Sequence, residues 1–155
     1  MTMDKSMRMM EANKELVKQA SFETYTEGNT DVIDELVSDS YVLHDPTSPE
    51  AIRGREAFKE HVESIRRAFP DLTTTIEHTA VEGDLVAVQF TVGGTHEGPF
   101  PDLDLEPTGE TFEMDGMEFD RIEDGQLAET WLVFDSLAFA QQLGAVPDED
   151  SATVH

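Results

Sequence analysis

The sequence contains no cysteine, which excludes disulfide bonds, thiolate nucleophiles and zinc sites built on thiolates. It also lacks any apolar run of about 18 residues that could cross a membrane. Residues 1–10 show no signal-peptide pattern and are predicted to form a flexible N-terminus. The histidine spacing does not favour a metal, and there is no phosphate-binding glycine loop or serine nucleophile elbow. We therefore expect no metal and no cofactor.

Basic residues are scarce, with 10 Lys and Arg against 34 Asp and Glu and a net charge of −24. A surface of this sign repels phosphates, so neither a nucleic-acid partner nor an anionic membrane is expected. The 38% of hydrophobic residues fall in periodic segments, which argues against disorder. Salt screens the self-repulsion of such a chain. The composition therefore favours a cytoplasmic protein of a halophile, whose stability rises with salt.

The length of 155 residues fits one domain, predicted at 11–146, followed by a disordered acidic tail at 147–155. Hydrophobic periodicity and capping residues predict helices at 11–27, 30–37, 55–68 and 137–143. Strands are expected at 41–44, 72–82, 85–93, 112–122 and 126–134. Gly83-Asp84 and Asp124-Gly125 are typical two-residue hairpin turns. The order indicates an α+β fold, with three N-terminal helices packed on a curved, mostly antiparallel sheet.

The second hairpin carries the most informative pattern. If Asp124-Gly125 is a two-residue turn in an uninterrupted ladder, Glu118 faces Trp131 and Met114 faces Asp135. A period of two then divides the side chains between two faces. One face holds Glu118, Glu129, Trp131, Val133 and Asp135, and the other holds Met117, Phe119, Leu132 and Phe134. Carboxylates beside an indole are typical of a pocket, although Glu118 and Glu129 could equally lie at a solvated rim.

Asp135 follows an apolar strand end and precedes another apolar segment. Desolvation raises the pKa of a carboxyl group in such surroundings, which suits proton transfer near neutral pH. The alternative is that Asp135 is only the N-cap of the helix predicted at 137–143. Spacing alone favours the cap, and the two roles are compatible.

Three histidines lie where a pocket could use them. His44 ends a strand, His78 faces Gln89 across the first hairpin, and His96 lies in a loop. Each is more often a hydrogen-bonded structural residue than a catalyst.

Several short motifs follow one another along residues 20–144. They are Tyr-Val-x-His-Asp-Pro ending at Pro46, Gly54-Arg55-Glu56, Ala68-Phe69-Pro70-Asp71, Gly94-Thr95-His96-x-Gly98, Pro107-Thr108-Gly109, Arg121-Ile122-Glu123-Asp124-Gly125, Glu129-x-Trp131-x-x-x-Asp135 and Gln141-Gln142-Leu143-Gly144. Together they resemble the SnoaL-like polyketide cyclases, or ester cyclases, of the NTF2-like superfamily. Ser136 and Ala138 depart from the residues common in that family, as does Glu110.

The resemblance implies a cone-shaped fold, a cofactor-free reaction and a catalytic acid/base at Asp135. The family reaction is an intramolecular aldol condensation of a polyketide methyl ester. The resemblance also implies a homodimer formed through the open sheet face, where Met117, Leu132 and Phe134 are expected. Because members of this family differ in substrate, the resemblance does not fix the reaction.

Two functions remain open. In the first, Asp135 removes a proton α to a carbonyl of a small apolar or polyketide-like substrate, with His96 and His44 as catalytic partners. The predicted substrate-binding residues are Trp131, Glu118, Phe100 and His78. In the second, the protein binds a small apolar ligand without catalysis. A buried Asp135 at the end of a closed cavity favours catalysis, and an Asp135 that only caps a helix favours binding.

Overall fold

The computed structural model describes residues 4–100 and 104–146. Helix α1, Lys5–Ser21, begins before the predicted residue 11 because the Asp4 carboxylate caps it, accepting a hydrogen bond from the Met7 N–H at 2.8 Å. Lys5 and the residues after it are therefore helical, so the helix is longer at its N-terminal end than the predicted 11–27. The predicted acidic tail at 147–155 lies outside the described residues.

The chain then reverses through short elements. A π-helical turn, η1 (Phe22–Thr26), continues α1 and ends before Gly28, whose φ of 71° is the left-handed conformation expected of a helix C-cap. A 3₁₀ turn, η2 (Thr30–Val32), and helix α2 (Ile33–Leu36) follow. Asn29 caps this segment, since its side-chain oxygen accepts a hydrogen bond from the Asp31 N–H at 3.3 Å. Strands β1 (Val37–His44) and β2 (Ile52–Arg53) precede helix α3 (Arg55–Ala68), whose bounds match the prediction.

The second half of the chain forms two hairpins and a final helix. The elements are β3 (Thr73–Glu82), β4 (Leu85–Thr95), β5 (Thr111–Glu123), β6 (Gln126–Phe134) and α4 (Ser136–Gln142). The six strands form one sheet in the order β2-β1-β6-β5-β4-β3. Neighbouring strands are antiparallel except β1 and β6, which are parallel. His78 pairs with Gln89, as the Gly83-Asp84 turn predicted.

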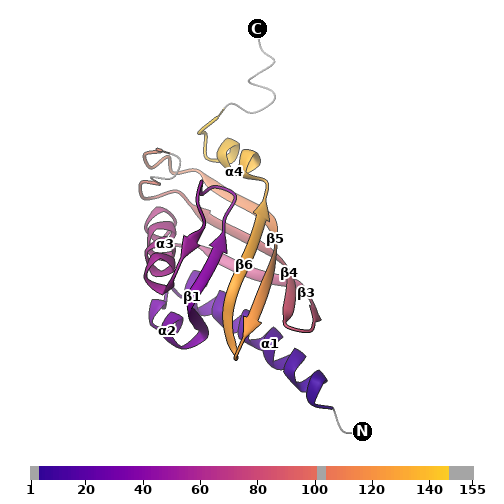
Figure 1. The fold of residues 1–155 in the computed structure, drawn as a ribbon. Helices are drawn as coiled ribbons and strands as arrows, with labels where there is room; N and C mark the ends of the chain where they lie inside the picture. Colours follow the sequence, from indigo (N-terminus) through magenta and orange to yellow (C-terminus); the bar gives the residue numbers. More distant parts are fainter. Residues whose placement is uncertain (1–3, 101–103, 147–155) are drawn as a thin grey trace.

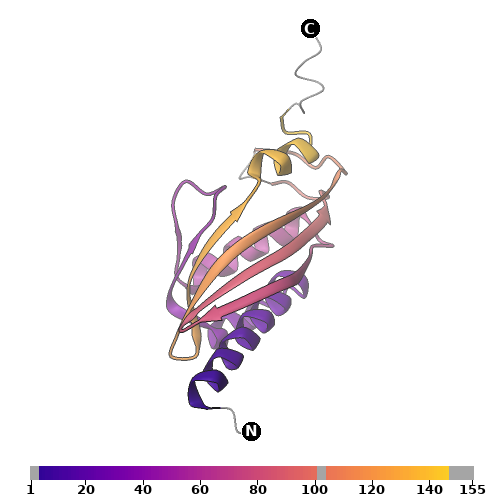
Figure 2. The same ribbon diagram turned by 90° about the vertical axis from the view of Figure 1, so that its right-hand side faces the viewer.

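The sheet is curved, and α1 and α3 pack against one of its faces (Figure 1). Figure 2 shows that none of the helices in the described residues covers the other face of β3 to β6. Buried side chains from α1, α3 and the strands meet in one cluster, including Val17, Phe58, Val62 and Val88. The α+β prediction is confirmed, with the addition of α4 at the C-terminal end of the sheet.

The register of the β5–β6 hairpin differs from the predicted one. A bulge interrupts the ladder between Arg121, which pairs with Glu129, and Ile122, which pairs with Leu127. Ala128 is the extra residue, so Phe119 faces Trp131 and Glu118 faces Leu132. A shift of one residue moves every later side chain of one strand to the opposite face relative to its partner strand.

The two faces of the hairpin consequently have different members from those predicted. Glu118, Leu132 and Phe134 point toward the helices and line an internal cavity. The opposite face exposes four large apolar side chains, Met117, Phe119, Trp131 and Val133, hereafter the outer apolar patch. The prediction that Leu132 and Phe134 lie on the open face is therefore wrong.

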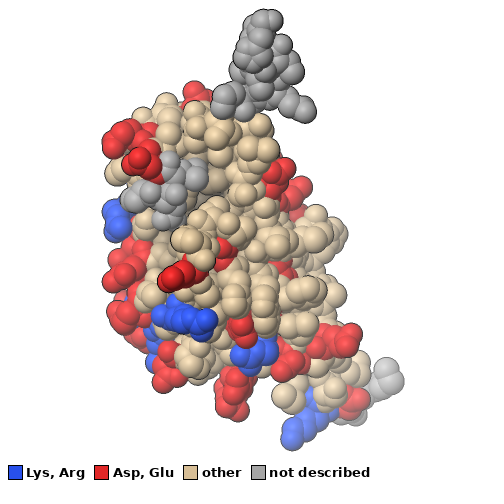
Figure 3. All heavy atoms as spheres, turned by 45° about the horizontal axis from the view of Figure 1, so that its top comes forward, with Lys and Arg blue, Asp and Glu red and all other residues tan. Residues whose placement is uncertain are grey.

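The charged side chains are distributed unevenly over the surface. In Figure 3, Asp and Glu line much of the outline of this face, Lys and Arg form a few separate groups among them, and a broad area in the upper middle is uncharged. No helix in the part of the chain that the structure describes is long and apolar enough to span a membrane.

Candidate active site

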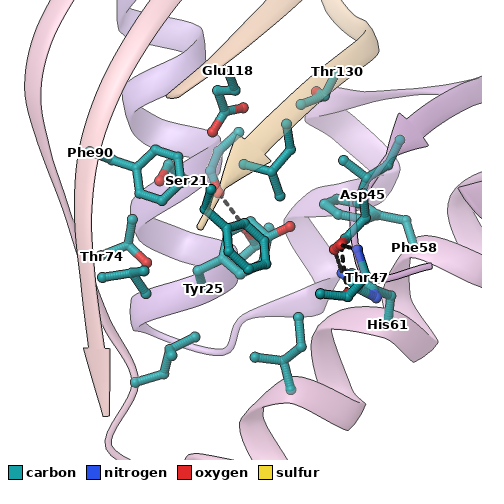
Figure 4. Close-up of a pocket in the computed structure, with 18 of the residues that line it drawn as sticks. Ser21, Tyr25, Asp45, Thr47, Phe58, His61, Thr74, Phe90, Glu118 and Thr130 are labelled. Atoms are coloured by element: carbon teal, nitrogen blue, oxygen red, sulfur yellow. Dashed lines mark hydrogen bonds and ion pairs between the residues drawn. The ribbon is translucent and has the colours of Figure 1, made fainter. Parts of the chain in front are cut away.

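A cavity of about 130 Å³ lies between the helices and the inner face of the sheet. Helices α1 and α3 contribute Ala20, Phe58 and His61, and the strands contribute side chains such as Phe90 and Glu118 (Figure 4). Gly116 helps to shape this wall, because a Cβ there would lie 2.4 Å from Cζ of Phe90. The cavity is therefore built from residues far apart in the sequence, and most of its lining is apolar.

Two carboxyl groups of β5 face this cavity. Glu118 and Asp120 are two positions apart in one strand, so both point inward. Burial raises the pKa of Glu118 well above its usual range, and the charge of Asp120 and a hydrogen bond with it raise it further. Two carboxylates cannot hydrogen-bond without a proton between them. Glu118 is thus the group that holds a proton near neutral pH.

Asp120 is held in place from the far side by a chain of hydroxyl groups. The Tyr41 hydroxyl donates to Thr130 Oγ1 at 2.7 Å, and Thr130 donates to Asp120 Oδ1 at 2.5 Å. Burial raises the pKa of Asp120, while the hydrogen bonds from Glu118 and Thr130 oppose that rise. Within the described residues, Asp120 Oδ2 is buried without a hydrogen-bond partner apart from the shared proton that Glu118 can supply. The pair is therefore rigid, with Asp120 as its more acidic member.

A second acid/base pair lines the same cavity from a different wall. Asp45, just after β1, lies 3.4 Å from Nε2 of His61 in α3, measured from its Oδ2. Its Oδ1 accepts hydrogen bonds from the Thr47 N–H at 2.8 Å and the Thr47 hydroxyl at 2.7 Å. Burial raises the pKa of Asp45, but the hydrogen bonds from His61 and Thr47 outweigh burial, and the net pKa is lowered. The ionised Asp45 therefore orients the His61 imidazole through the contact between its Oδ2 and Nε2 of the ring.

Tyr25 brings a phenol to the same cavity from the π-helical turn η1. The Arg66 guanidinium fixes this turn by donating hydrogen bonds to the carbonyl oxygens of Tyr25 at 2.8 Å and Thr26 at 3.0 Å. Burial raises the pKa of the Tyr25 hydroxyl well above its usual range, and the charges of Glu118, Asp45 and Asp120 add to the rise. The phenol thus stays protonated and can donate a hydrogen bond to a ligand.

The predicted position of Asp135 is wrong. Its side chain is exposed, accepts a hydrogen bond from the Ala138 N–H at 2.9 Å and caps α4, and it is not among the residues that line the cavity. The strand alternation that places Trp131 on the outer face carries Asp135 to the same side. Of the two roles considered for this residue, the structure shows the helix cap.

The other predicted residues are divided between cavity, core and surface. Glu118 and Phe100 line the cavity, as expected of substrate-binding residues. Trp131 lies on the outer face, and His78 is exposed on β3. Neither Trp131 nor His78 contributes to the cavity, so their predicted place in a pocket is wrong.

His44 and His96 are also absent from the cavity lining. Nε2 of His44 bonds Glu129 Oε2 at 2.7 Å, and its ring stacks on Trp131 at 5.7 Å. His96 is fully buried against Phe69, and its Nδ1 accepts from the Thr108 N–H at 3.3 Å. The proton of the neutral His96 ring is then on Nε2, which has no partner in the described structure. Neither histidine therefore lies where the cavity could use it.

Signals for the residues that were missed are present in the sequence. Asp120 follows Glu118 by two positions, which is the spacing of one strand face. Asp45 lies next to His44 in the motif that ends at Pro46, and His61 lies between Phe58 and Ile65 on the inner stripe of α3. Only the fold, however, shows that these three elements surround one cavity.

Within residues 4–100 and 104–146, no three His, Asp or Glu side chains are grouped as a metal site would require. The site described here therefore consists of two acid/base pairs and a phenol around an apolar cavity.

Comparisons with known proteins agree with this architecture. Similar solved structures include a proposed SnoaL-like polyketide cyclase from Jannaschia sp. CCS1, with 27% identity, a TM-score of 0.79, and coverage of 94% of this chain and 100% of that one. A proposed polyketide cyclase from Acidithiobacillus ferrooxidans is 30% identical, with a TM-score of 0.75 and coverage of 86% and 94%. AclR from Streptomyces galilaeus, a proposed hydroxylase, is 26% identical, with a TM-score of 0.75 and coverage of 90% and 85%.

The search of curated proteins found no match. The family model described as SnoaL-like polyketide cyclase matches residues 15–143, which is most of the chain. This protein belongs to the SnoaL-like polyketide cyclase family.

Proposed function

We propose that this protein is a cofactor-free acid/base enzyme that removes a proton α to a carbonyl group, as in an intramolecular aldol condensation. The observation that carries the proposal is the pair Glu118–Asp120 inside an apolar cavity, with a raised pKa at Glu118. A carboxyl group that keeps its proton near neutral pH can protonate a developing alkoxide. Family membership supports this reaction class, and the proposal moves the acid from Asp135 to Glu118.

Each group has a role that follows from its protonation. His61, oriented by Asp45, is the base that takes the α proton, and Asp45 stabilises the imidazolium that results. The phenol of Tyr25 donates a hydrogen bond to the enolate oxygen. In an aldol step, the enolate carbon forms a bond to a second carbonyl carbon, and Glu118 transfers its proton to the new alkoxide. Positioned proton transfer of this kind contributes roughly 10²–10⁴-fold to a rate.

The experiment measures hydrogen–deuterium exchange at the α carbon of acetophenone in D₂O by NMR, which needs no knowledge of the natural substrate. The protein should accelerate exchange over buffer, and His61→Asn should abolish most of that acceleration. Glu118→Gln should lower it, because the enolate oxygen loses the carboxyl group that donates a hydrogen bond to it alongside Tyr25, whereas Asp135→Asn should leave it unchanged.

The alternative function, binding without catalysis, predicts no exchange above buffer in any of these proteins. Loss of exchange in Asp135→Asn, with the rate retained in His61→Asn and Glu118→Gln, would instead return the catalytic role to Asp135.

A further inference from the structure

We infer that the cavity takes an uncharged compound of single-ring size and rejects carboxylates and other anions. The inference rests on the proposed function only in assigning this compound as a substrate. The size and charge preferences follow from the cavity itself, and binding alone can measure them.

The volume sets the size of the occupant. An engineered cavity of about 150 Å³, lined by Leu, Ile and Phe in another protein, binds benzene. The cavity here measures about 130 Å³, which suits one six-membered ring with a small substituent. A fused ring system of the kind that polyketide cyclization produces requires more room than this.

One end of the cavity is shaped for a flat ring. Phe69 lies at the centre of a group of phenylalanine rings, with centroid distances of 5.6 Å to Phe100, 4.9 Å to Phe112 and 6.0 Å to Phe139. All four rings line the cavity. Four of the five contacts among these rings are edge-to-face, and aromatic ligands favour the same geometry. This end therefore favours an aromatic or alicyclic ring.

The charges around the cavity are of one sign. Asp45, Glu118 and Asp120 line it, whereas none of the 10 Lys and Arg, all of which lie in the described residues, does so. Among the described lining residues, His61 is the one basic side chain, and its Nε2 lies 3.4 Å from Asp45 Oδ2, so it offers no unpaired positive charge to a ligand. An anion that entered would lose its hydration beside Asp120 without gaining a counterion. Anionic ligands are therefore excluded by the lining itself.

An uncharged ligand still finds polar partners here. The shared proton of Glu118 and the hydroxyl of Tyr25 are donors for a carbonyl oxygen. Asp120 is 1% exposed, and within the described residues its Oδ2 has no partner besides the Glu118 proton, so it can accept from a hydroxyl or amide group when Glu118 donates that proton to the ligand. The favoured compound thus carries a carbonyl, amide or hydroxyl group beside its ring.

The test compares benzamide with benzoate, which match in shape and differ in charge. Binding is measured by isothermal titration calorimetry at pH 7 in about 1 M KCl, where the Debye length of about 3 Å suppresses repulsion by the acidic surface. Benzamide should bind at least tenfold more tightly than benzoate and than 2-naphthamide. Absence of benzamide binding, or equal affinity for benzoate, overturns the charge preference, and equal affinity for 2-naphthamide overturns the size preference.

Matched variants locate the source of the discrimination. Asp120→Asn should reduce the benzamide-to-benzoate ratio at least threefold, because it removes a buried charge at little change in volume. Glu63→Gln removes one exposed charge from the outer side of α3 and should leave the ratio unchanged. If Asp120→Asn does not fold, Asp45→Asn removes a cavity charge from another wall and should lower the ratio in the same way. An unchanged ratio in the folded cavity variant overturns the assignment to the lining.

The two proposals fail separately. Selective benzamide binding without α exchange of acetophenone refutes the catalytic function and keeps the ligand class. Exchange by a protein that binds benzoate as well as benzamide refutes the ligand class and keeps the catalytic function.

Discussion

Successive side chains of the β5–β6 hairpin point to opposite faces of the sheet, and the carboxyl groups on the two faces have different surroundings. On the inner face, Glu118 and Asp120 lie in an apolar cavity, where burial raises the pKa of both carboxyl groups. On the outer face, Glu129 is ion-paired with Arg121 and His44, and these contacts lower its pKa. The pKa of a carboxyl group in this hairpin therefore depends on the face of the sheet to which its side chain points.

The apolar residues differ between the faces in the same way. Phe90 is 7% exposed on the inner side, whereas Phe119 of the neighbouring strand is 51% exposed on the outer side. Inner rings shape the cavity, and the outer ones remain available to a partner. Four predictions test this contrast, beginning with the largest expected effect.

Replacing a phenylalanine by alanine should lower the free energy of unfolding far more on the inner face than on the outer face. Phe90→Ala should lower the free energy of unfolding by about 3–5 kcal/mol, because it enlarges a cavity in the core. Phe119→Ala should cost about 1 kcal/mol or less, because half of its surface is already in water. Urea denaturation in molar KCl at one low protein concentration measures both. Equal losses would mean that something covers the outer face even at that concentration.

The outer apolar patch should hold two copies of the chain together. Exposed apolar side chains that lie next to one another mark an interaction surface, and a symmetric dimer would cover the patch with itself. Val133→Glu should weaken this dimer at least a hundredfold, which corresponds to about 2.7 kcal/mol. Analytical ultracentrifugation in molar KCl checks the prediction, with Glu63→Gln as a control of equal charge change and opposite sign. A wild-type protein that is monomeric at all concentrations would contradict the prediction.

The inner carboxyl pair should give stability an unusual pH dependence. A carboxyl group whose pKa is raised by folding contributes fully below its ordinary value, 4.5 for Glu118, and its contribution is lost as the pH rises through the raised pKa. Stability should therefore fall over that window, and Glu118→Gln should flatten the fall. Asp45 has the opposite sign, because its pKa is lowered, so its contribution is lost as the pH falls below its ordinary value of 3.8. Chemical denaturation across the pH range of 4 to 8 measures the slope, and a slope unchanged by Glu118→Gln would contradict the burial of a protonated acid.

The smallest effect should come from Asp135. Asp135→Ala removes the helix cap and should cost about 1 kcal/mol, whereas Asn caps almost as well and should cost less than about 0.5 kcal/mol. The same denaturation assay measures both variants. A loss from Asp135→Asn as large as that from Phe90→Ala would show that this carboxylate is buried and not exposed.

The sequence predicted the elements well, because hydrophobic periodicity and turn residues are local signals. Helix α3, both hairpin turns and the helices-then-strands order follow from residues near one another in the chain. The absence of cysteine and the acidic composition are likewise properties of the chain itself.

The site depended on the tertiary structure, because it joins distant segments and one irregular position. Nothing in the sequence around Ala128 indicates a β-bulge. The bulge at this residue nevertheless determines that Glu118 faces Leu132 and not Trp131. Likewise, nothing local to Asp45, His61 or Asp120 shows that a loop, a helix and a strand meet around one cavity. The sequence alone determined which elements form and in what order. The packing of those elements decided which carboxyl groups lose their water, and that loss is what gives a carboxyl group the proton affinity that the proposed reaction needs.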